Sequence, residues 1–112
     1  MWGGAPVSRE ETGDPSVFHE VEAQRYVFLD DGRVIGIAEY APSGGAHVFS
    51  HTEVLPAHEG GGVGSRLVRA ALDDARRRGW TIVARCSFVA AFIRRHPDYA
   101  DLLVAGDGRP AT

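Results

Sequence analysis

Two side chains near the middle of the chain could take up or release protons. His51 and Glu53 stand two residues apart in a strand-like run, and simple alternation would place His47, Phe49, His51 and Glu53 on one face. Either His51 or Glu53 could act as a general base, and Glu53 is favoured because it lies nearer the end of the run. A structural, hydrogen-bonding His51 is the alternative. A metal site of His47, His51 and Glu53 would lack an evident fourth ligand, so we expect no metal.

Cys86 is the only cysteine of the chain, which excludes an intrachain disulfide and indicates a reducing compartment. It follows the strand expected at residues 80–85 and precedes the helix expected at residues 88–95. The thiol could be a nucleophile, a proton donor or a packed small apolar group.

Glycine occupies four of the five positions 60–64, at the point where a helix is expected to start. A helix N-terminus has unpaired N–H groups and a partial positive charge, so this segment is typical of a phosphate or pyrophosphate site. A plain flexible loop is the alternative. A Walker loop would need a lysine, which the chain lacks, and a dinucleotide fingerprint would need glycine at the position of Ser65.

These residues require a sheet and two helices to position them. Alternating apolar residues predict three strands, with tight turns at Asp31-Gly32 and at residues 42–45. From Val63 the apolar spacing becomes helical and ends at Gly79, and a strand and a second helix capped by Ser87 follow. The predicted strands are residues 25–29, 34–40, 47–54 and 80–85, and the second helix is 88–95.

The predicted fold is of the α/β class with a single domain. Three antiparallel strands form a meander, and the helical crossover after them favours a fourth strand paired in parallel, followed by a C-terminal helix. We expect a flexible leader over residues 1–16, one domain over 17–103 and a tail over 104–112.

Composition excludes several classes of function. A net charge of −3 argues against a nucleic-acid partner, and no apolar run approaches the roughly 18 residues that span a membrane. The N-terminus lacks the features of a signal peptide, so a cytoplasmic location is expected. All twelve basic residues are arginine, as is typical of GC-rich bacterial genomes.

The glycine segment resembles the acetyl-CoA signature of the GNAT superfamily of N-acetyltransferases, Gln/Arg-x-x-Gly-x-Gly/Ala, which falls on residues 59–64 (EGGGVG). Residues 51–54 (HTEV) and 86–99 (CSFVAAFIRRHPDY) resemble small, single-domain GNAT-like proteins. The resemblance covers roughly residues 25–102. It implies acetyl-CoA as cofactor and transfer of an acetyl group to an amine of a small molecule or a protein, by a monomer or homodimer. A CoA-binding protein with little or no transferase activity is the alternative, because residues 1–24 are too short to form the acceptor groove of larger members.

The resemblance also implies a set of cofactor contacts. The pantetheine arm would lie between the splayed third and fourth strands, with backbone groups of Val54 and Leu55 beside it. Phe88 and Phe92 would flank the thioester end or the pantetheine. The loop that binds the pyrophosphate would comprise Glu59, Gly60, Gly61, Gly62, Val63, Gly64 and Ser65.

Two departures from the family pattern affect the expected chemistry. Glu59 stands where the family has Arg or Gln, and an acid beside a pyrophosphate repels it by about 1 kcal/mol per charge pair at 4 Å in water. Many members carry a tyrosine as general acid in the last helix, where this chain has Phe92, and its nearest hydroxyl is that of Tyr99. That departure favours Cys86 as the proton donor.

Overall fold

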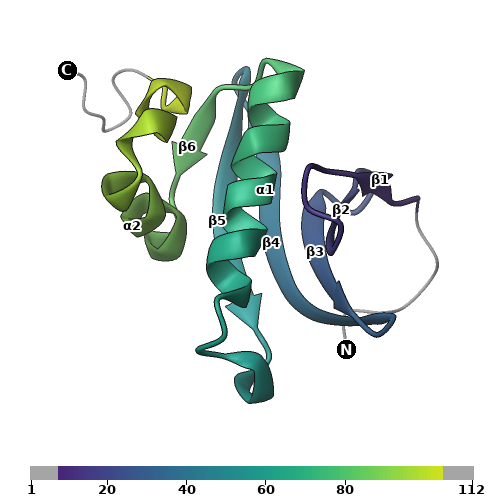
Figure 1. Cartoon of the computed structure of the whole chain (residues 1–112). Coiled ribbons are helices and arrows are strands. Elements are labelled where there is room, and N and C mark those ends of the chain that lie inside the picture. The colour runs from purple at the N-terminus through teal and green to yellow at the C-terminus, as the bar shows by residue number, and fades with distance from the viewer. Residues whose placement is uncertain (1–7, 105–112) are drawn as a thin grey trace.

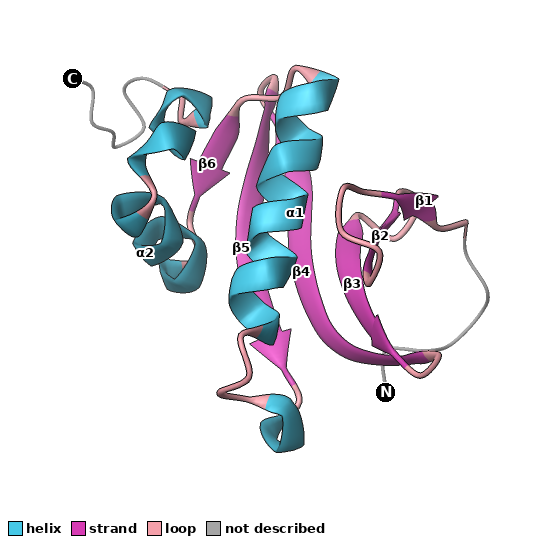
Figure 2. Cartoon of the chain, viewed as in Figure 1, coloured by secondary structure: helices cyan, strands magenta, loops and turns pink. Residues whose placement is uncertain are grey.

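The computed structural model describes residues 8–104, which form one six-stranded sheet with two α-helices packed on it (Figure 1). The strands are β1 (Glu10–Glu11), β2 (Val17–Glu20), β3 (Arg25–Asp30), β4 (Arg33–Ser43), β5 (Ala46–Val54) and β6 (Ile82–Ala84). The helices are α1 (Val63–Arg78) and α2 (Ser87–Arg95), and short 3-10 helices lie at Pro56–His58 and Pro97–Leu102 (Figure 2). Within this described part, no helix combines the length and apolar character needed to cross a membrane.

The predicted order of elements is confirmed from β3 onward. β3, β4 and β5 form the antiparallel meander, and α1 returns the chain so that β6 pairs with β5 in parallel. The turn at Asp31-Gly32 has positive φ at both residues, +53° and +77°, as this dipeptide predicts.

The first two strands were not predicted. β1 pairs with β2, and β2 pairs with β3, both antiparallel, so the sheet begins inside the expected leader of residues 1–16. β2 was missed because its four residues include His19 and Glu20, which are fully buried yet polar and so hide the apolar pattern of a strand. Residues 1–7 and 105–112 of the expected leader and tail lie outside the described residues.

The apolar stripe of α1 packs on the sheet as predicted, against β2, β3, β4 and β5. Asp74 is buried among these apolar side chains, and its carboxylate accepts hydrogen bonds from Arg78 at 2.7 Å and from Arg77 at 2.9 Å. Asp74 and Arg78 are four residues apart and form an i,i+4 ion pair. Asp73 instead accepts a hydrogen bond from Tyr99.

The ladder between β4 and β5 contains a bulge at Ser50. Tyr40 pairs with Phe49 and Glu39 pairs with His51, so Ser50 is an extra residue on β5. The bulge shifts the alternation of β5 by one residue, so that each side chain after Ser50 lies on the face opposite to the one that simple alternation predicts.

The bulge divides the side chains of β5 between two faces. His47 and Phe49 lie on the face that packs against α1, where Phe49 joins the buried core. His51 and Glu53 lie on the opposite face, while Thr52 moves to the helix side. The prediction that His47, Phe49, His51 and Glu53 share a face is therefore wrong.

Candidate functional site

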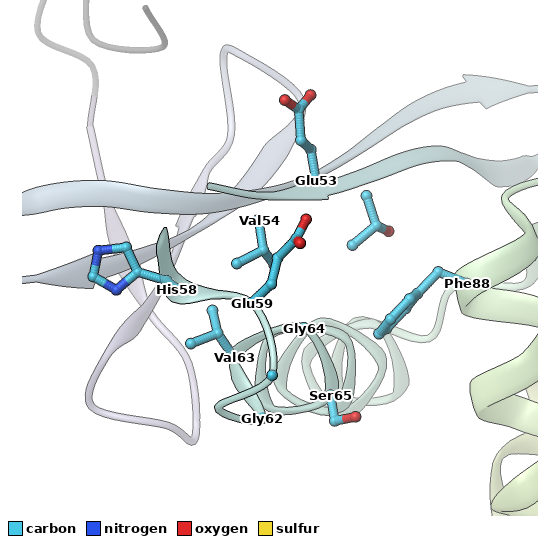
Figure 3. A pocket seen from close by; sticks show the side chains of 11 residues that line it. Glu53, Val54, His58, Glu59, Gly62, Val63, Gly64, Ser65 and Phe88 are labelled. Atoms are coloured by element: carbon cyan, nitrogen blue, oxygen red, sulfur yellow. The ribbon is translucent and has the colours of Figure 1, made fainter. Parts of the chain in front are cut away.

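A cavity of about 470 Å³ lies between the end of β5, the glycine loop and the first turns of α1 and α2 (Figure 3). Its volume is within the range of small-molecule sites. The lining residues are Thr52, Glu53, Val54, His58, Glu59, Gly60, Gly62, Val63, Gly64, Ser65 and Phe88. Most of the residues that the sequence assigned to a cofactor therefore lie together, although Leu55, Gly61 and Phe92 are not part of the lining.

The glycine loop leaves the first N–H groups of α1 without side-chain partners. Gly60 and Gly62 have φ of +86° and +82°, which side chains rarely tolerate, and Gly62 is the N-cap of α1. No side chain among residues 8–104 caps the helix, and its first turn carries no acidic residue. The N–H groups of Val63, Gly64 and Ser65 therefore form a site suited to an anion.

Phe88 forms one wall of the cavity directly above the first turn of α1. A Cβ placed on Gly64 would lie 2.8 Å from Cζ of Phe88, so the ring rests against the glycine backbone. Phe88 is nevertheless 38% exposed. The absence of a side chain at Gly64 therefore allows the ring of Phe88 to lie against the first turn of α1.

β5 and β6 separate after a short parallel ladder. Residues 47–49 pair with residues 82–84, and the carbonyl of Phe49 then accepts the N–H groups of Arg85 and Cys86, at 3.1 and 2.9 Å. Beyond this point, residues 50–54 of β5 have no strand partner on the β6 side in the described part of the chain. The expected splay is therefore present.

The open edge of β5 offers the backbone groups of Thr52 and Val54. The N–H of Leu55 donates to the carbonyl of Ile35 at 2.9 Å, which places Leu55 opposite Ile35 in the ladder. By the alternation of an antiparallel ladder, Glu53 also bonds toward β4, whereas Thr52 and Val54 point toward the splay. Val54 therefore has backbone groups directed into the splay, and so does Thr52, which the sequence did not single out, whereas the N–H of Leu55 is already occupied.

His51 and Glu53 lie beside each other on the sheet face opposite the cavity. The His51 Nε2 is 3.0 Å from the Glu53 Oε1, and the two side chains are 51% and 48% exposed. Figure 3 shows the Glu53 carboxylate directed away from the cavity, although Glu53 contributes to the lining. The fold brings the two candidate bases together but separates their side chains from the cavity.

Cys86 and Thr52 meet across the splay. The Cys86 thiol donates a hydrogen bond to Oγ1 of Thr52, with 3.5 Å between Sγ and Oγ1. Cys86 is itself the N-cap of α2, and Ser87 is the first helical residue and makes no capping bond, so the predicted cap at Ser87 is wrong. Thr52 could have been found from the sequence if the bulge at Ser50 had been known.

The described residues that line the cavity include glutamates but no arginine. The carboxylate of Glu59 extends across the cavity toward β5 (Figure 3). Among the described lining residues, only His58 has a side chain with an ionisable nitrogen.

Phe92 and Tyr99 belong to the core instead of the cavity. Phe92 is fully buried and lies against His96 and Tyr99. The Tyr99 hydroxyl donates to Asp73 at 2.7 Å, and burial followed by this bond raises the pKa of Tyr99. Phe92 has no proton to exchange, and Tyr99 does not line the cavity.

His47 is also a packing residue. Its ring stacks on Trp80 with 3.7 Å between centroids, on the face opposite His51. Within residues 8–104, no three His, Cys, Asp or Glu side chains are grouped closely enough to hold a metal. His47, His51 and Glu53 do not converge, because His47 lies on the other face of the sheet from the other two.

Comparison with known proteins identifies relatives of this chain. The family model described as GCN5-related N-acetyl-transferase matches residues 25–102. A GCN5-like putative N-acetyltransferase from Staphylococcus aureus has a similar structure, with a TM-score of 0.58, 22% identity and 88% of each chain covered. No curated protein matches the chain.

Two further solved structures are less similar. One is a ribosomal-protein-alanine N-acetyltransferase from Brucella melitensis, with a TM-score of 0.49 and 20% identity over 89% of this chain and 72% of that one. The other is the aminoglycoside N-acetyltransferase AAC(6')-Iy in complex with CoA, with a TM-score of 0.47 and 17% identity over 88% of this chain and 75% of that one.

The family match runs from the start of β3 to the end of the last 3-10 helix. It therefore includes the glycine loop, the splay between β5 and β6, and Cys86. The Staphylococcus aureus structure shows the same fold over most of both chains. The chain belongs to the GCN5-related N-acetyltransferase family.

Proposed function

We propose that the protein binds acetyl-CoA in the cavity and transfers its acetyl group to an amine. The family supports acetyl transfer as the reaction class. The observation that carries the binding site is the set of uncapped N–H groups at Val63, Gly64 and Ser65, which suit a pyrophosphate.

The open edge of β5 fits the amide groups of a pantetheine arm. Thr52 and Val54 direct backbone N–H and C=O groups into the splay, where an extended chain could add as a strand does. The ring of Phe88 supplies an apolar wall beside the same space. The residues present therefore fit the cofactor that the family uses.

Bound acetyl-CoA would supply a thioester carbonyl, and the protein must move the protons. An ordinary alkylamine has a pKa of about 10.4 and must lose a proton before it can attack. We assign this step to the His51–Glu53 pair, which flanks the open edge of β5 from the face opposite the cavity. The amine would accordingly approach from that face.

Cys86 is the proposed proton donor to the leaving thiolate, in a direct transfer without an acetylated enzyme. Its thiol lies at the splay and is held by Thr52. A reducing compartment suits this free thiol, so we place the protein in the cytoplasm. It would act as a monomer or homodimer on an amine of a small molecule or a protein.

Calorimetric titration with acetyl-CoA and with CoA tests the proposed site. Saturable binding near one to one is expected, followed by release of CoA thiol when a panel of primary amines is added. Binding without thiol release from any amine would favour the alternative, a CoA-binding protein with little or no transferase activity. Absence of binding at high micromolar ligand would contradict both functions.

A further inference from the structure

Cys86 does not itself line the cavity, although the proposed function, on which the following inference rests, makes its thiol the proton donor. Its side chain is half-buried at the N-cap of α2 and packs against the hydrophobic core. A proton that leaves the Cys86 thiol therefore needs a carrier before it can reach a sulfur atom in the cavity.

Thr52 connects the thiol to the cavity. Its side chain belongs to the lining, and its Oγ1 accepts a hydrogen bond from the Cys86 thiol, with 3.5 Å between Sγ and Oγ1. The hydroxyl proton of Thr52 has no acceptor among residues 8–104. Because a hydroxyl both accepts and donates, Thr52 can take the proton of the thiol and offer its own proton to a ligand.

The place of Thr52 along the cavity suits the reacting end of acetyl-CoA. The pyrophosphate is proposed to bind at the N-terminus of α1. Of the β5 residues in the lining, Thr52 is the nearest in the strand to Phe49, where β5 and β6 come together. Among the described lining residues, the other hydroxyl belongs to Ser65, in the first turn of α1. Thr52 is therefore the lining hydroxyl at the end of the cavity away from the pyrophosphate.

The hydroxyl of Thr52 could not donate a proton alone. Even water has a pKa of about 15.7, so an aliphatic hydroxyl that gives up its proton near pH 7 must be reprotonated in the same step. We infer that Thr52 relays the proton of the Cys86 thiol to the leaving sulfur of acetyl-CoA. Both ends of this relay are alkyl thiols, so the proton passes between groups of similar acidity.

The relay moves two protons in one step. The Thr52 hydroxyl passes its proton to the leaving sulfur, which keeps the electron pair of the broken C–S bond, while Oγ1 takes the proton of the Cys86 thiol. The Cys86 thiolate then recovers a proton from water. Thr52 ends the step unchanged.

The S–H stretching band in the infrared tests the relay without turnover, because Cys86 is the only cysteine and acetyl-CoA has no S–H group. We expect Thr52→Val to move the band to higher frequency and Thr52→Ser to keep it near its wild-type position, since only valine removes the acceptor. Acetyl-CoA should lower the frequency further in the wild type, because hydrogen bonds in a chain polarise one another, and should not move it in Thr52→Val.

Transfer rates give the second test, with hydroxylamine as acceptor because this small amine is already neutral near pH 7. Thr52→Val and Cys86→Ala should each lower kcat by about 100-fold, the lower range of a general acid, with the Kd for acetyl-CoA nearly unchanged. The double variant should lose no more than either single variant, because two groups of one relay act as a unit. Thr52→Ser should keep most of the activity. Thr81→Val, which removes an exposed hydroxyl at a residue outside the lining, is the matched control and should change neither band nor rate.

The outcomes separate the relay from the proposed function. A band that Thr52→Val does not move, a Thr52→Val variant as active as the wild type, or a loss that lies in Kd instead of kcat would overturn the relay and leave acetyl transfer standing. A double variant about 10⁴-fold slower than the wild type would also overturn it, since the two groups would then act independently. If the wild type binds acetyl-CoA but accelerates its reaction with neither hydroxylamine nor any amine of the panel, the proposed transfer itself fails.

Discussion

Individual side chains at the end of β5 have access to different sides of the sheet. Thr52 faces the cavity and holds the thiol of Cys86, whereas His51 and Glu53 are exposed on the other face. All four lie at the stretch where β5 leaves β6. This arrangement is the basis for assigning proton donation to the thiol and proton removal to the histidine–carboxylate pair.

Replacing Cys86 tests the role of its thiol as a proton donor. Cys86→Ala should lower the rate of acetyl transfer to an active amine by about 100-fold, the lower range of a general acid, while the Kd for acetyl-CoA changes little. Cys86→Ser retains a hydroxyl donor and should keep part of the activity. Steady-state kinetics combined with titration separates the two effects.

Intact-mass spectrometry of the wild type after incubation with acetyl-CoA distinguishes direct transfer from an acetylated enzyme. Direct transfer predicts an unchanged protein mass. An acetyl group on wild type that is absent from Cys86→Ala would contradict direct transfer and make the thiol the nucleophile.

At the scale of elements, the start of α1 depends on two glycines with left-handed backbone conformation. Gly62 provides the N-cap, and its φ of +82° orients the chain so that the helix N–H groups meet the cavity. Gly61 lies between Gly60 and Gly62 and does not need to be glycine, since a Cβ there would meet only the His58 carbonyl, at an ordinary 3.8 Å. The neighbouring glycines are therefore matched probes of the loop.

Gly62→Ala should lower the free energy of unfolding by about 1–2 kcal/mol, because an L side chain is strained at this φ. It should also weaken acetyl-CoA binding as the loop moves. Gly61→Ala should leave both quantities nearly unchanged. Denaturant unfolding and calorimetry measure them, and equal losses in the two variants would show that the loop conformation at Gly62 does not shape the site.

At the scale of the whole molecule, a buried polar network joins α1 to three strands. Asp74 accepts the hydroxyl of Tyr26 at 2.7 Å, and Nδ1 of His19 lies 3.5 Å from the same carboxylate, at ion-pair distance. The other ring nitrogen of His19 contacts the Tyr40 hydroxyl at 2.6 Å. Burial opposes ionisation of Asp74, but contacts with His19, Tyr26 and Arg78 outweigh it and hold its pKa well below the usual value.

This network and the stacked His47 predict a loss of stability in acid in two stages. Burial, with a smaller effect of His19, lowers the pKa of His47. Below about pH 6.5 the unfolded chain therefore binds a proton at His47 that the folded protein does not, and the free energy of unfolding falls. The pKa of Asp74 is also lowered, so the ionised carboxylate contributes its full share of the free energy of unfolding above about pH 3.8, and this share is lost as pH falls below that value.

Thermal unfolding between pH 8 and pH 2 follows the first stage and the onset of the second. His47→Phe keeps a ring against Trp80 and should remove the first decline in Tm, while Asp74→Asn should lower Tm near neutral pH and flatten the second. A first decline that persists unchanged in His47→Phe would assign it to another group.

Much of the fold was predictable because short-range patterns encode it. The meander, the crossover helix and the parallel strand followed from alternation, helical spacing and the turn at Asp31-Gly32. β2 was missed because its buried polar residues contact side chains outside the strand: Nε2 of His19 contacts the Tyr40 hydroxyl, and the Glu20 carboxylate accepts hydrogen bonds from Arg9 and Arg25. Sequence patterns near β2 contain no sign of those contacts.

The amino-acid sequence by itself determined the glycine loop and the start and end of α1, because backbone conformation and helix capping depend on adjacent residues. The family was also predictable, because its signature is a short run of neighbouring residues. Tertiary structure decided which side chains share a face. The bulge at Ser50 arises from the pairing of β4 with β5, and it alone moves Thr52 into the cavity and His51 out of it. Strand register is a property of two segments at once, so one segment's alternation could not reveal it.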